Sequence, residues 1–487
     1  MCHFALRVLA VAAACVMAAS VVTSCDFDEE SDVPGEAPVY SIPDDDLDDG
    51  VDLGPYADLA PVGPVLGETF GLASQMSGAA EDAWKREFEA KTLEAINVKK
   101  IRVGFSWADV EPRNDTWEWS RTDALLDAAL AHGLEWNARL AYRTDWAAPG
   151  GSPSEIDPGD FVDYAAHVAA RYCGDIPRYE IWNEPNLYHF WEPEPDPAHY
   201  GELLKAAYTA VKGECEEAEV LFGGLSSNNF PQEFFFNTYP FFDQVAAAHP
   251  DVCEYFDAMP IHPYTILQMA APERRAEALG IVAPDLPGQV DDIRARMAAA
   301  GCGEKPVLFT EFGYPSTYIG DDTQAAFSVR TVLLGATRQV TGYYLYTFWD
   351  KTGREPPTEN DFGMFEFPAT DDDAQVPKTA FFAYRTLVEL LASTRYAGDL
   401  REAIGLPRDV YALAFVDDAG RLIVAVWRAR RGGDAPMVAI PVPPGATAAR
   451  VIDMSGDVAD ADLSGDIEVE ASPYVRYVEF TLAKTWW

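Results

Sequence analysis

Residues 178–186 read Arg-Tyr-Glu-Ile-Trp-Asn-Glu-Pro-Asn, and this stretch decides how the rest of the chain is interpreted. Its first four residues favour a short strand, so the carboxyl group of Glu184 is expected where a strand gives way to a loop. A second stretch, residues 306–314, reads Pro-Val-Leu-Phe-Thr-Glu-Phe-Gly-Tyr and places Glu311 at the end of another buried-type strand. The two glutamates are far apart in the sequence, so only the fold can bring their side chains together.

Strand-like and helix-like segments alternate from about residue 65 to residue 392. Eight strands, each followed by a helix, are typical of an α/β (β/α)8 TIM barrel, whose catalytic residues stand at the carboxyl ends of strands. The expected strands are Thr69–Ala73, Lys100–Phe105, Glu135–Ala141, Tyr179–Trp182, Glu219–Gly223, Ala258–His262, Val307–Thr310 and Gly342–Phe348. The expected helices are Glu81–Ile96, Thr122–His132, Pro158–Tyr172, Asp196–Val211, one within about 231–249, Val290–Ala300, Ala325–Arg338 and Pro377–Leu391.

The pattern changes after Ser393. Short alternating runs separated by Gly-rich and Pro-rich turns predict a C-terminal all-β sandwich module over 394–487, after a barrel over 63–393. Only a short stretch follows the last helix, so we expect the module to pack on the barrel. The expected strands of the module are Val410–Val416, Arg421–Ala429, Met437–Val442, Ala448–Met454, Ile467–Ala471 and Tyr474–Leu482.

The first 24 residues have the features of an export signal. An apolar run too short for a comfortable membrane span ends in Val22-Thr23-Ser24-Cys25, which resembles a bacterial lipoprotein processing box. The resemblance implies cleavage before Cys25, lipidation of that cysteine, and an exported protein anchored to the membrane of the bacterial cell envelope. Ordinary signal cleavage, with Cys25 incidental, is the alternative.

Acidic residues dominate the composition, and the formal net charge is −43. Binding to nucleic acid requires basic surface that neutralises phosphates, so this class of partner is excluded. The acidity is most concentrated in residues 26–58, which contain 13 Asp and Glu and neither Lys nor Arg. Like charges extend such a segment, and it has too little apolar surface to fold, so we expect residues 25–62 to form a disordered tether.

Four cysteines lie in the barrel region: Cys173, Cys215, Cys253 and Cys302. An even number in an exported protein favours two disulfides. All four precede expected strands, which places them at the amino-terminal face of the barrel. Their order along the chain predicts the pairs Cys173–Cys215 and Cys253–Cys302. Neither a Cys-x-x-Cys pair nor a histidine cluster indicates a metal site, and no cofactor is expected.

The motifs at the strand ends resemble those of the clan A glycoside hydrolases. They are Trp-Asn-Glu-Pro-Asn at 182–186, Thr-Glu-Phe-Gly at 310–313, His-Pro-Tyr at 262–264 and Phe-Trp-Asp at 348–350. The resemblance covers the whole barrel and implies a retaining glycosidase that cleaves O-glycosidic bonds of a poly- or oligosaccharide by double displacement. It implies Glu184 as the acid/base and Glu311 as the nucleophile, with carboxyl groups about 5–5.5 Å apart.

Three neighbouring side chains have physical roles in this interpretation. Asn183 can donate a hydrogen bond to a substrate 2-hydroxyl group. Arg102 can keep Glu311 ionised through its charge, and Tyr264 can orient Glu311 by hydrogen bonding. Because Glu184 must start protonated, the two carboxyl groups need different pKa values, and an arginine nearer Glu311 produces that difference. The alternative for Arg102 is a surface position on its strand.

Two further residues, His262 and Trp349, complete the predicted substrate-binding set with Arg102, Asn183 and Tyr264. His262 can contact the substrate or the carboxyl groups, and its alternative is a hydrogen-bonded core histidine. Trp349 can offer an apolar face to a sugar ring, and its alternative is plain packing.

Within clan A the chain resembles family 39 more than family 5. Family 5 usually has a histidine after the third strand, whereas this chain reads Leu140-Ala141-Tyr142-Arg143 there. Family 39 includes β-xylosidases, α-iduronidases and exopolysaccharide hydrolases, so the sugar, its linkage and endo or exo action stay open. A non-catalytic glycan-binding surface lipoprotein on the same barrel is the alternative function, and a transglycosylase would share every site residue. The oligomeric state is open, and a monomer agrees with the sequence.

Overall fold

The computed structural model describes residues 52–227, 238–265, 270–274, 276–278, 281–351, 360–368, 370, 373–430 and 434–487. The expected signal segment, the lipidation site Cys25 and the tether up to residue 51 lie outside the described residues. Among the helices that are described, none is long and apolar enough to cross a membrane.

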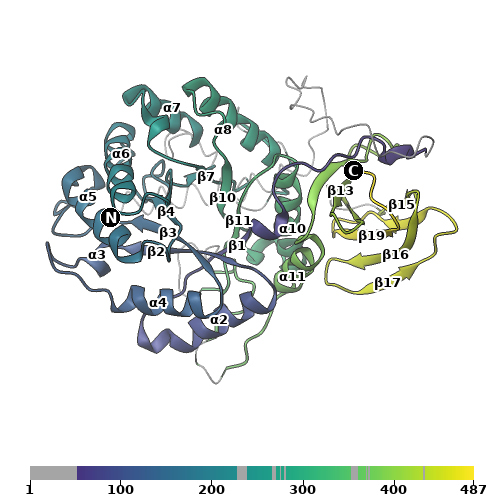
Figure 1. Ribbon diagram of the computed structural model, residues 1–487, viewed down its shortest axis with the longest axis horizontal. Coiled ribbons are helices and arrows are strands. Elements are labelled where there is room, and N and C mark those ends of the chain that lie inside the picture. Colours follow the sequence, from purple (N-terminus) through teal and green to yellow (C-terminus); the bar gives the residue numbers. More distant parts are fainter. Residues whose placement is uncertain are drawn as a thin grey trace. The chain divides into compact units, whose positions relative to one another are not determined.

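The larger part of the described chain is a barrel of parallel strands surrounded by helices (Figure 1). The nine strands follow the order β5-β4-β3-β2-β1-β11-β10-β7-β6. β5 and β6 follow each other directly in the chain, and together they occupy the position of the fifth barrel strand. A parallel bridge between Leu221, at the end of β5, and Ala258, just before β7, closes the sheet into a barrel. The predicted (β/α)8 barrel is therefore confirmed. The strands are β1 (Phe70–Ala73), β2 (Lys100–Ser106), β3 (Glu135–Ala141), β4 (Arg178–Ile181), β5 (Glu219–Leu221), β6 (Leu225–Ser226), β7 (Met259–His262), β10 (Val307–Phe312) and β11 (Tyr343–Leu345).

The helices between the strands pack against the outside of the sheet (Figure 1). Asp157, Asp196 and Asp285 cap three of them: each carboxylate accepts a backbone N–H of the first turn, and a proline occupies the first or second helical position. The helices are α2 (Ala83–Ala95), α3 (Trp107–Val110), α4 (Ser120–Ala131), α5 (Pro158–Tyr172), α6 (Pro197–Glu214), α7 (Thr238–Ala248), α8 (Leu286–Ala300), α9 (Ser316–Ile319), α10 (Asp321–Ala336) and α11 (Thr379–Leu391). A short two-stranded ribbon, β8 (Ala276–Ala278) with β9 (Ile281–Ala283), precedes α8.

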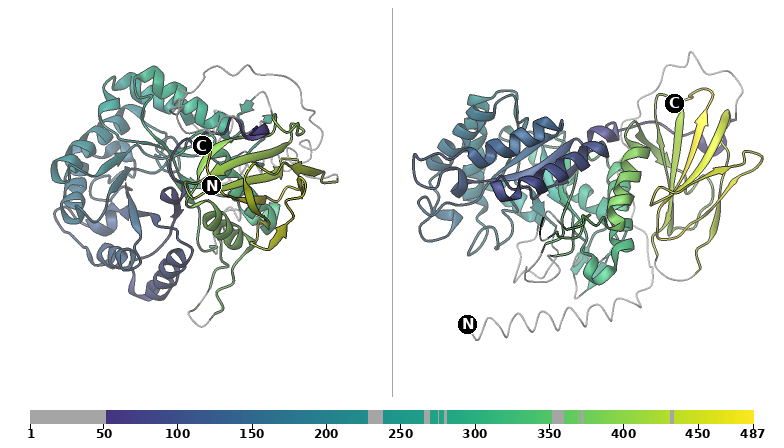
Figure 2. Two further views of the ribbon diagram at one scale, coloured as in Figure 1. Left: turned by 45° about the vertical axis from the view of Figure 1, so that its right-hand side comes forward. Right: turned by 90° about the horizontal axis from the view of Figure 1, so that it is seen from below.

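The C-terminal residues form an all-β module, drawn in green to yellow in Figure 2. A six-stranded antiparallel sheet has the order β12-β13-β14-β19-β16-β17, and β15 pairs with β18. The predicted all-β module is confirmed, while β12 and β17 are additions that the sequence pattern does not predict. The strands are β12 (Arg395–Asp399), β13 (Val410–Val416), β14 (Arg421–Arg428), β15 (Met437–Ile440), β16 (Ala446–Asp453), β17 (Val458–Ala461), β18 (Ile467–Glu470) and β19 (Arg476–Leu482).

One face of the β-module packs on the barrel. Phe415 and Trp427 are buried in the same apolar cluster as Leu387 of α11. The guanidinium group of Arg421 donates a hydrogen bond to the backbone carbonyl of Leu390 at 3.0 Å. The expectation that the module packs on the barrel is therefore confirmed.

The last part of the expected tether is folded. Gly54–Tyr56 form a 3-10 helix, and Tyr56 and Leu59 are buried in the apolar core of the β-module. The N–H of Val62 donates a hydrogen bond to the carbonyl of Tyr396 at 2.8 Å. The expected disorder up to residue 62 is wrong for this part of the chain, because apolar burial and pairing with β12 outweigh the acidic composition.

Both predicted disulfides are present. Cys173–Cys215 joins the C-terminal ends of α5 and α6, with Cα atoms 5.4 Å apart. Cys253–Cys302 joins the segments that precede β7 and β10, with Cα atoms 5.3 Å apart. The disulfides lie at the amino-terminal ends of the strands, away from Glu184 and Glu311, so they are structural.

Candidate active site

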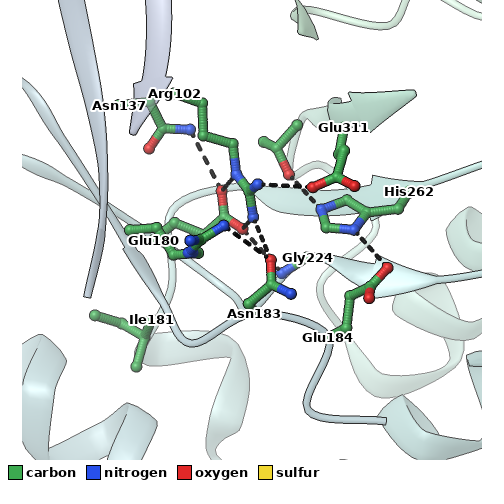
Figure 3. A network of polar contacts seen from close by, with 12 residues as sticks. Arg102, Asn137, Glu180, Ile181, Asn183, Glu184, Gly224, His262 and Glu311 are labelled. Atoms are coloured by element: carbon green, nitrogen blue, oxygen red, sulfur yellow. Dashed lines mark hydrogen bonds and ion pairs between the residues drawn. The ribbon is translucent and has the colours of Figure 1, made fainter. Parts of the chain in front are cut away.

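Glu184 follows β4 in a turn of unusual backbone conformation. Trp182 and Glu184 have positive φ angles of 75° and 43°, which non-glycine residues adopt only at a cost in free energy. Two backbone hydrogen bonds stabilise the turn. The N–H of Trp182 donates to the carbonyl of Leu140 at 2.9 Å, and the N–H of Glu184 donates to the carbonyl of Gly224 at 3.0 Å. The turn points the carboxyl group of Glu184 at His262 (Figure 3).

Glu311 lies on β10 and accepts two hydrogen bonds. The phenol of Tyr264 donates to Oε1 at 2.6 Å, and Nη1 of Arg102 donates to Oε2 at 3.1 Å in an ion pair. The Glu311 side chain is 16% exposed, against 2% for Arg102, so the carboxylate is reachable from outside. Both predicted contacts, from Arg102 and from Tyr264, are present.

Arg102 also pairs with Glu180, a residue of β4 that the motifs do not include. Nε and Nη2 of Arg102 donate to the two carboxylate oxygens of Glu180 at 2.9 and 2.6 Å, and both side chains are buried. Burial alone would raise the pKa of Glu180, but the charge and hydrogen bonds of Arg102 outweigh it and lower that pKa. The signal for Glu180 in the sequence is its position between Tyr179 and Ile181 in a predicted strand, where a charged side chain is unusual.

The amide group of Asn183 is oriented by two arginines. Its Oδ1 accepts hydrogen bonds from Nη2 of Arg102 at 2.9 Å and from Nη1 of Arg139 at 3.2 Å. Guanidinium groups only donate, so they hold the oxygen toward themselves and leave the NH2 group facing away (Figure 3). This orientation agrees with the expected donation to a substrate hydroxyl group. Arg139, on β3, is a further residue that the motifs do not include.

His262 is fully buried between Glu184 and Thr310. Nδ1 lies 2.9 Å from Oε1 of Glu184, and Nε2 lies 3.1 Å from Oγ1 of Thr310. Burial lowers the pKa of His262 to about 4, so the ring is neutral and has one donor and one acceptor nitrogen. The neutral ring can donate from Nδ1 to an ionised Glu184, or accept at Nδ1 from a protonated Glu184. In both cases the hydroxyl of Thr310 can pair with Nε2, because a hydroxyl group can donate or accept.

The two carboxyl groups lie in different environments (Figure 3). Burial raises the pKa of Glu184 to about 7, and among the described residues no lysine or arginine forms an ion pair with it. Glu311, in contrast, is paired with Arg102. The arrangement therefore provides one carboxyl group that holds a proton near neutral pH and one that is paired with a guanidinium group.

The structure corrects part of the expected substrate-binding set. The side chains of Arg102 and His262 are 2% and 0% exposed, so they contact carboxyl groups and cannot reach a sugar. For His262, the contact with Glu184 is one of the two contacts that the sequence predicts for it. Trp349 is partly exposed, and its ring packs against four aromatic side chains. Its ring neighbours are Trp84, Phe88, Phe348 and Phe365.

Comparison with known proteins shows a shared fold but a diverged sequence. No protein-family model matches the chain, and no curated protein matches it. Among solved structures, the fold is shared with glycoside hydrolases. A family 39 glycoside hydrolase from the gut symbiont Bacteroides cellulosilyticus WH2 is 21% identical, with a TM-score of 0.65 over 85% of this chain and 81% of that one.

Two further structures of this class align over most of the chain. The family 39 enzyme from Xanthomonas axonopodis pv. citri is 18% identical, with a TM-score of 0.59 over 88% of this chain and 96% of that one. A monomeric β-xylosidase from Caulobacter crescentus CB15 is 16% identical, with a TM-score of 0.59 over 87% of this chain and 98% of that one. The predicted resemblance to clan A, most like family 39, is confirmed at the level of the fold.

Proposed function

We propose that the protein is a retaining glycoside hydrolase that cleaves O-glycosidic bonds of a poly- or oligosaccharide by double displacement. The observation that carries the proposal is the contrast between Glu184 and Glu311. They stand at the ends of β4 and β10, and burial raises the pKa of Glu184 to about 7 while Arg102 and Tyr264 bind Glu311. The fold shared with family 39 enzymes supports the same assignment.

In the first step, the ionised Glu311 attacks the anomeric carbon while the bond to the leaving oxygen breaks. Glu184 gives its proton to that oxygen, and the sugar becomes an ester of Glu311. In the second step, Glu184 takes a proton from water as the water oxygen attacks the anomeric carbon and the ester bond breaks. Glu184 is then protonated again and Glu311 is free, so the site returns to its starting state.

Three residues support these steps without bonding to the reacting carbon. Arg102 and Tyr264 orient the carboxylate of Glu311 for attack. His262 hydrogen-bonds to Glu184 in the conformation from which the proton is given and taken back. In addition, Asn183 can donate its amide to a sugar hydroxyl, a bond that strengthens as positive charge develops on the sugar ring.

Azide rescue tests the two roles separately. Once a panel of aryl glycosides has identified a substrate, Glu311→Ala and Glu184→Ala are assayed with sodium azide. We expect Glu311→Ala to yield a glycosyl azide of inverted configuration, because azide replaces the missing nucleophile. Glu184→Ala should yield a glycosyl azide of retained configuration, because azide then attacks the ester on Glu311.

The exposed Glu254, remote from the site, provides the control: Glu254→Ala should behave as the wild type. If the wild type cleaves no member of a broad glycoside panel but binds a glycan tightly, the protein is instead the non-catalytic glycan-binding alternative. Azide products of the same configuration from both glutamate variants would contradict the assigned roles.

We also propose that the protein is exported and lipid-anchored through Cys25. The support is the apolar run and the processing box at residues 22–25. Cells fed a labelled fatty acid should incorporate the label into the wild-type protein and not into Cys25→Ser. Equal labelling of the two proteins, or none in the wild type, would contradict this location.

A further inference from the structure

The guanidinium group of Arg139 lies beside the reaction centre, and most of its hydrogen-bond donors have no acceptor. Nη1 donates to Oδ1 of Asn183 at 3.2 Å, and within the described part of the chain this is the one hydrogen bond that the side chain makes. A guanidinium group has five N–H donors. No described carboxylate forms an ion pair with Arg139, and its Nε is buried without a partner.

Arg139 differs from Arg102, on the neighbouring strand β2, in how it can be reached. The side chain of Arg102 is 2% exposed, and its donors are taken by Glu180, Glu311 and Asn183. Arg139 is partly exposed. Its Nη2 has no acceptor among the described residues and, unlike Nε, is not a buried atom. Arg139 can therefore meet a ligand that Arg102 cannot reach.

Two neighbours fix the position of the guanidinium group. Gly104 on β2 pairs in register with Arg139, and the three atoms nearest a Cβ at Gly104 would be Nη2 of Arg139 at 2.6 Å and Cζ and Nε at 3.2 Å. The guanidinium carbon lies 5.3 Å from the ring centroid of Tyr142, within cation–π range. Tyr142 in turn stacks on Phe190, with centroids 5.8 Å apart. A long side chain is thus held where it can recognise one atom of a ligand.

The neighbours of Arg139 indicate which atom of a sugar it meets. Burial raises the pKa of Glu184 and the charge of Arg139 opposes this shift, so the two side chains are near each other. Asn183, which Arg139 contacts, is the expected donor to the 2-hydroxyl group. On a pyranose ring, C2 is bonded to the anomeric carbon, which the two glutamates flank, and to C3. The open Nη2 beside Asn183 is therefore expected to meet the oxygen on C3.

We propose that Arg139 determines sugar specificity by donating a hydrogen bond from Nη2 to the 3-hydroxyl group of the sugar that becomes the ester of Glu311; the inference rests on the proposed function. The substrates are then glycans in which this sugar has a free hydroxyl group at C3. A charged donor that loses water and gains no acceptor costs free energy, so the site discriminates against a sugar without this oxygen.

The test compares a methyl glycoside with its 2-deoxy and 3-deoxy analogues. A panel of methyl pentosides and hexosides is titrated into the full-length protein, Kd is measured by NMR, and the two deoxy analogues of the tightest ligand follow. We expect the wild type to bind the 3-deoxy analogue about tenfold less tightly than the parent. Arg139→Met should reduce this ratio to about twofold or less, because the donor is absent.

A second variant displaces the guanidinium group and keeps its charge. The Cβ of Gly104→Ala has as its nearest neighbours the flexible end of Arg139, so the fold should persist while Nη2 moves, and the ratio should again fall to about twofold or less. Arg143→Met is the matched control. It removes an arginine that pairs with the exposed Asp145 at 2.7 Å, and the tenfold ratio should remain.

Equal Kd values for the parent and the 3-deoxy analogue in the wild type, or a tenfold ratio retained in Arg139→Met, would overturn the proposal. So would a panel in which no methyl glycoside binds. Loss of discrimination at C2 and not at C3 would show that Arg139 acts only through Asn183, which also overturns it. Binding needs no turnover, so discrimination at C3 by a protein that cleaves no glycoside supports the proposal and contradicts only the proposed function.

Discussion

At the scale of single residues, one arginine serves two carboxylates. The guanidinium group of Arg102 binds Glu180 through two nitrogens and Glu311 through a third. The planar guanidinium group has donors on three nitrogens that point in different directions, so it can bind two carboxylates. The ammonium group of a lysine has its charge and its donors on a single nitrogen. Because Glu180 is fully buried and ionised, its charge depends on Arg102. Arg102 therefore supports the structure of the barrel interior and the chemistry of Glu311 together.

Removal of Arg102 should cost both stability and activity. Arg102→Met leaves Glu180 as an uncompensated buried charge, so urea denaturation should show a loss of roughly 3–5 kcal/mol. Arg171→Met is the control, because its ion pair with Asp123 is solvent-exposed and should contribute less than about 1 kcal/mol. Similar losses for the two variants would contradict the role of Arg102.

The pH dependence should report the proton on Glu184. Its pKa of about 7 means that the acid form is present below pH 7 and is lost as pH rises. For substrates with a poor leaving group, kcat/KM should therefore fall about tenfold per pH unit above that value. Glu184→Gln should abolish this dependence in its residual activity, and persistence of the same alkaline limb in that variant would count against the assignment.

At the scale of the elements, Gly224 lies between β5 and β6, and its lack of a side chain allows close packing at the site. A Cβ atom on Gly224 would lie 2.3 Å from Nε2 of His262 and 3.0 Å from Oε1 of Glu180. The carbonyl of Gly224 also accepts a hydrogen bond from the N–H of Glu184. The absent side chain therefore lets three residues of the site approach one another.

Gly224→Ala should displace His262 and with it Glu184. We expect a loss of about 10²-fold in kcat/KM and of about 1–3 kcal/mol in stability. Gly213→Ala on α6 is the matched control, because its Cβ would meet no atom within 4 Å, and it should leave activity unchanged. Wild-type kinetics for Gly224→Ala would show that the close approach has no catalytic consequence.

The elements also show how far the sequence predicts the structure. The parallel strands of the barrel are buried on both faces, so they are visible as apolar runs bounded by turns. β6 has two residues and β17 is largely exposed, so neither has a pattern to detect. Glu184 and Glu311 are predictable from local motifs, whereas the partners Glu180 and Arg139 depend on contacts between strands.

At the scale of the whole molecule, the barrel is stabilised from two directions. The β-module shares an apolar cluster with α11. The two disulfides join segments that precede β4, β5, β7 and β10, at the amino-terminal ends of these strands. Composition predicts a tether up to residue 62, yet Tyr56 and Leu59 belong to the core of the β-module. Two apolar side chains among many acids are too weak a signal to find in the sequence.

The disulfides should contribute stability and leave catalysis unaffected. Replacing Cys173 and Cys215 together by alanine frees a long loop in the unfolded chain and should lower the free energy of unfolding by about 2–4 kcal/mol. At a temperature where the variant is folded, kcat/KM should equal that of the wild type. A folded variant with strongly reduced kcat would show that the disulfide is coupled to the site.

The most direct measurement of the central claim is covalent trapping of the nucleophile. A 2-deoxy-2-fluoro analogue of an identified substrate, with a good leaving group, slows both steps and allows the ester to accumulate. The account predicts one sugar per protein by mass spectrometry, attached to Glu311 within residues 306–314. A label on any other residue, or rapid turnover of the parent substrate with no label at all, would contradict it.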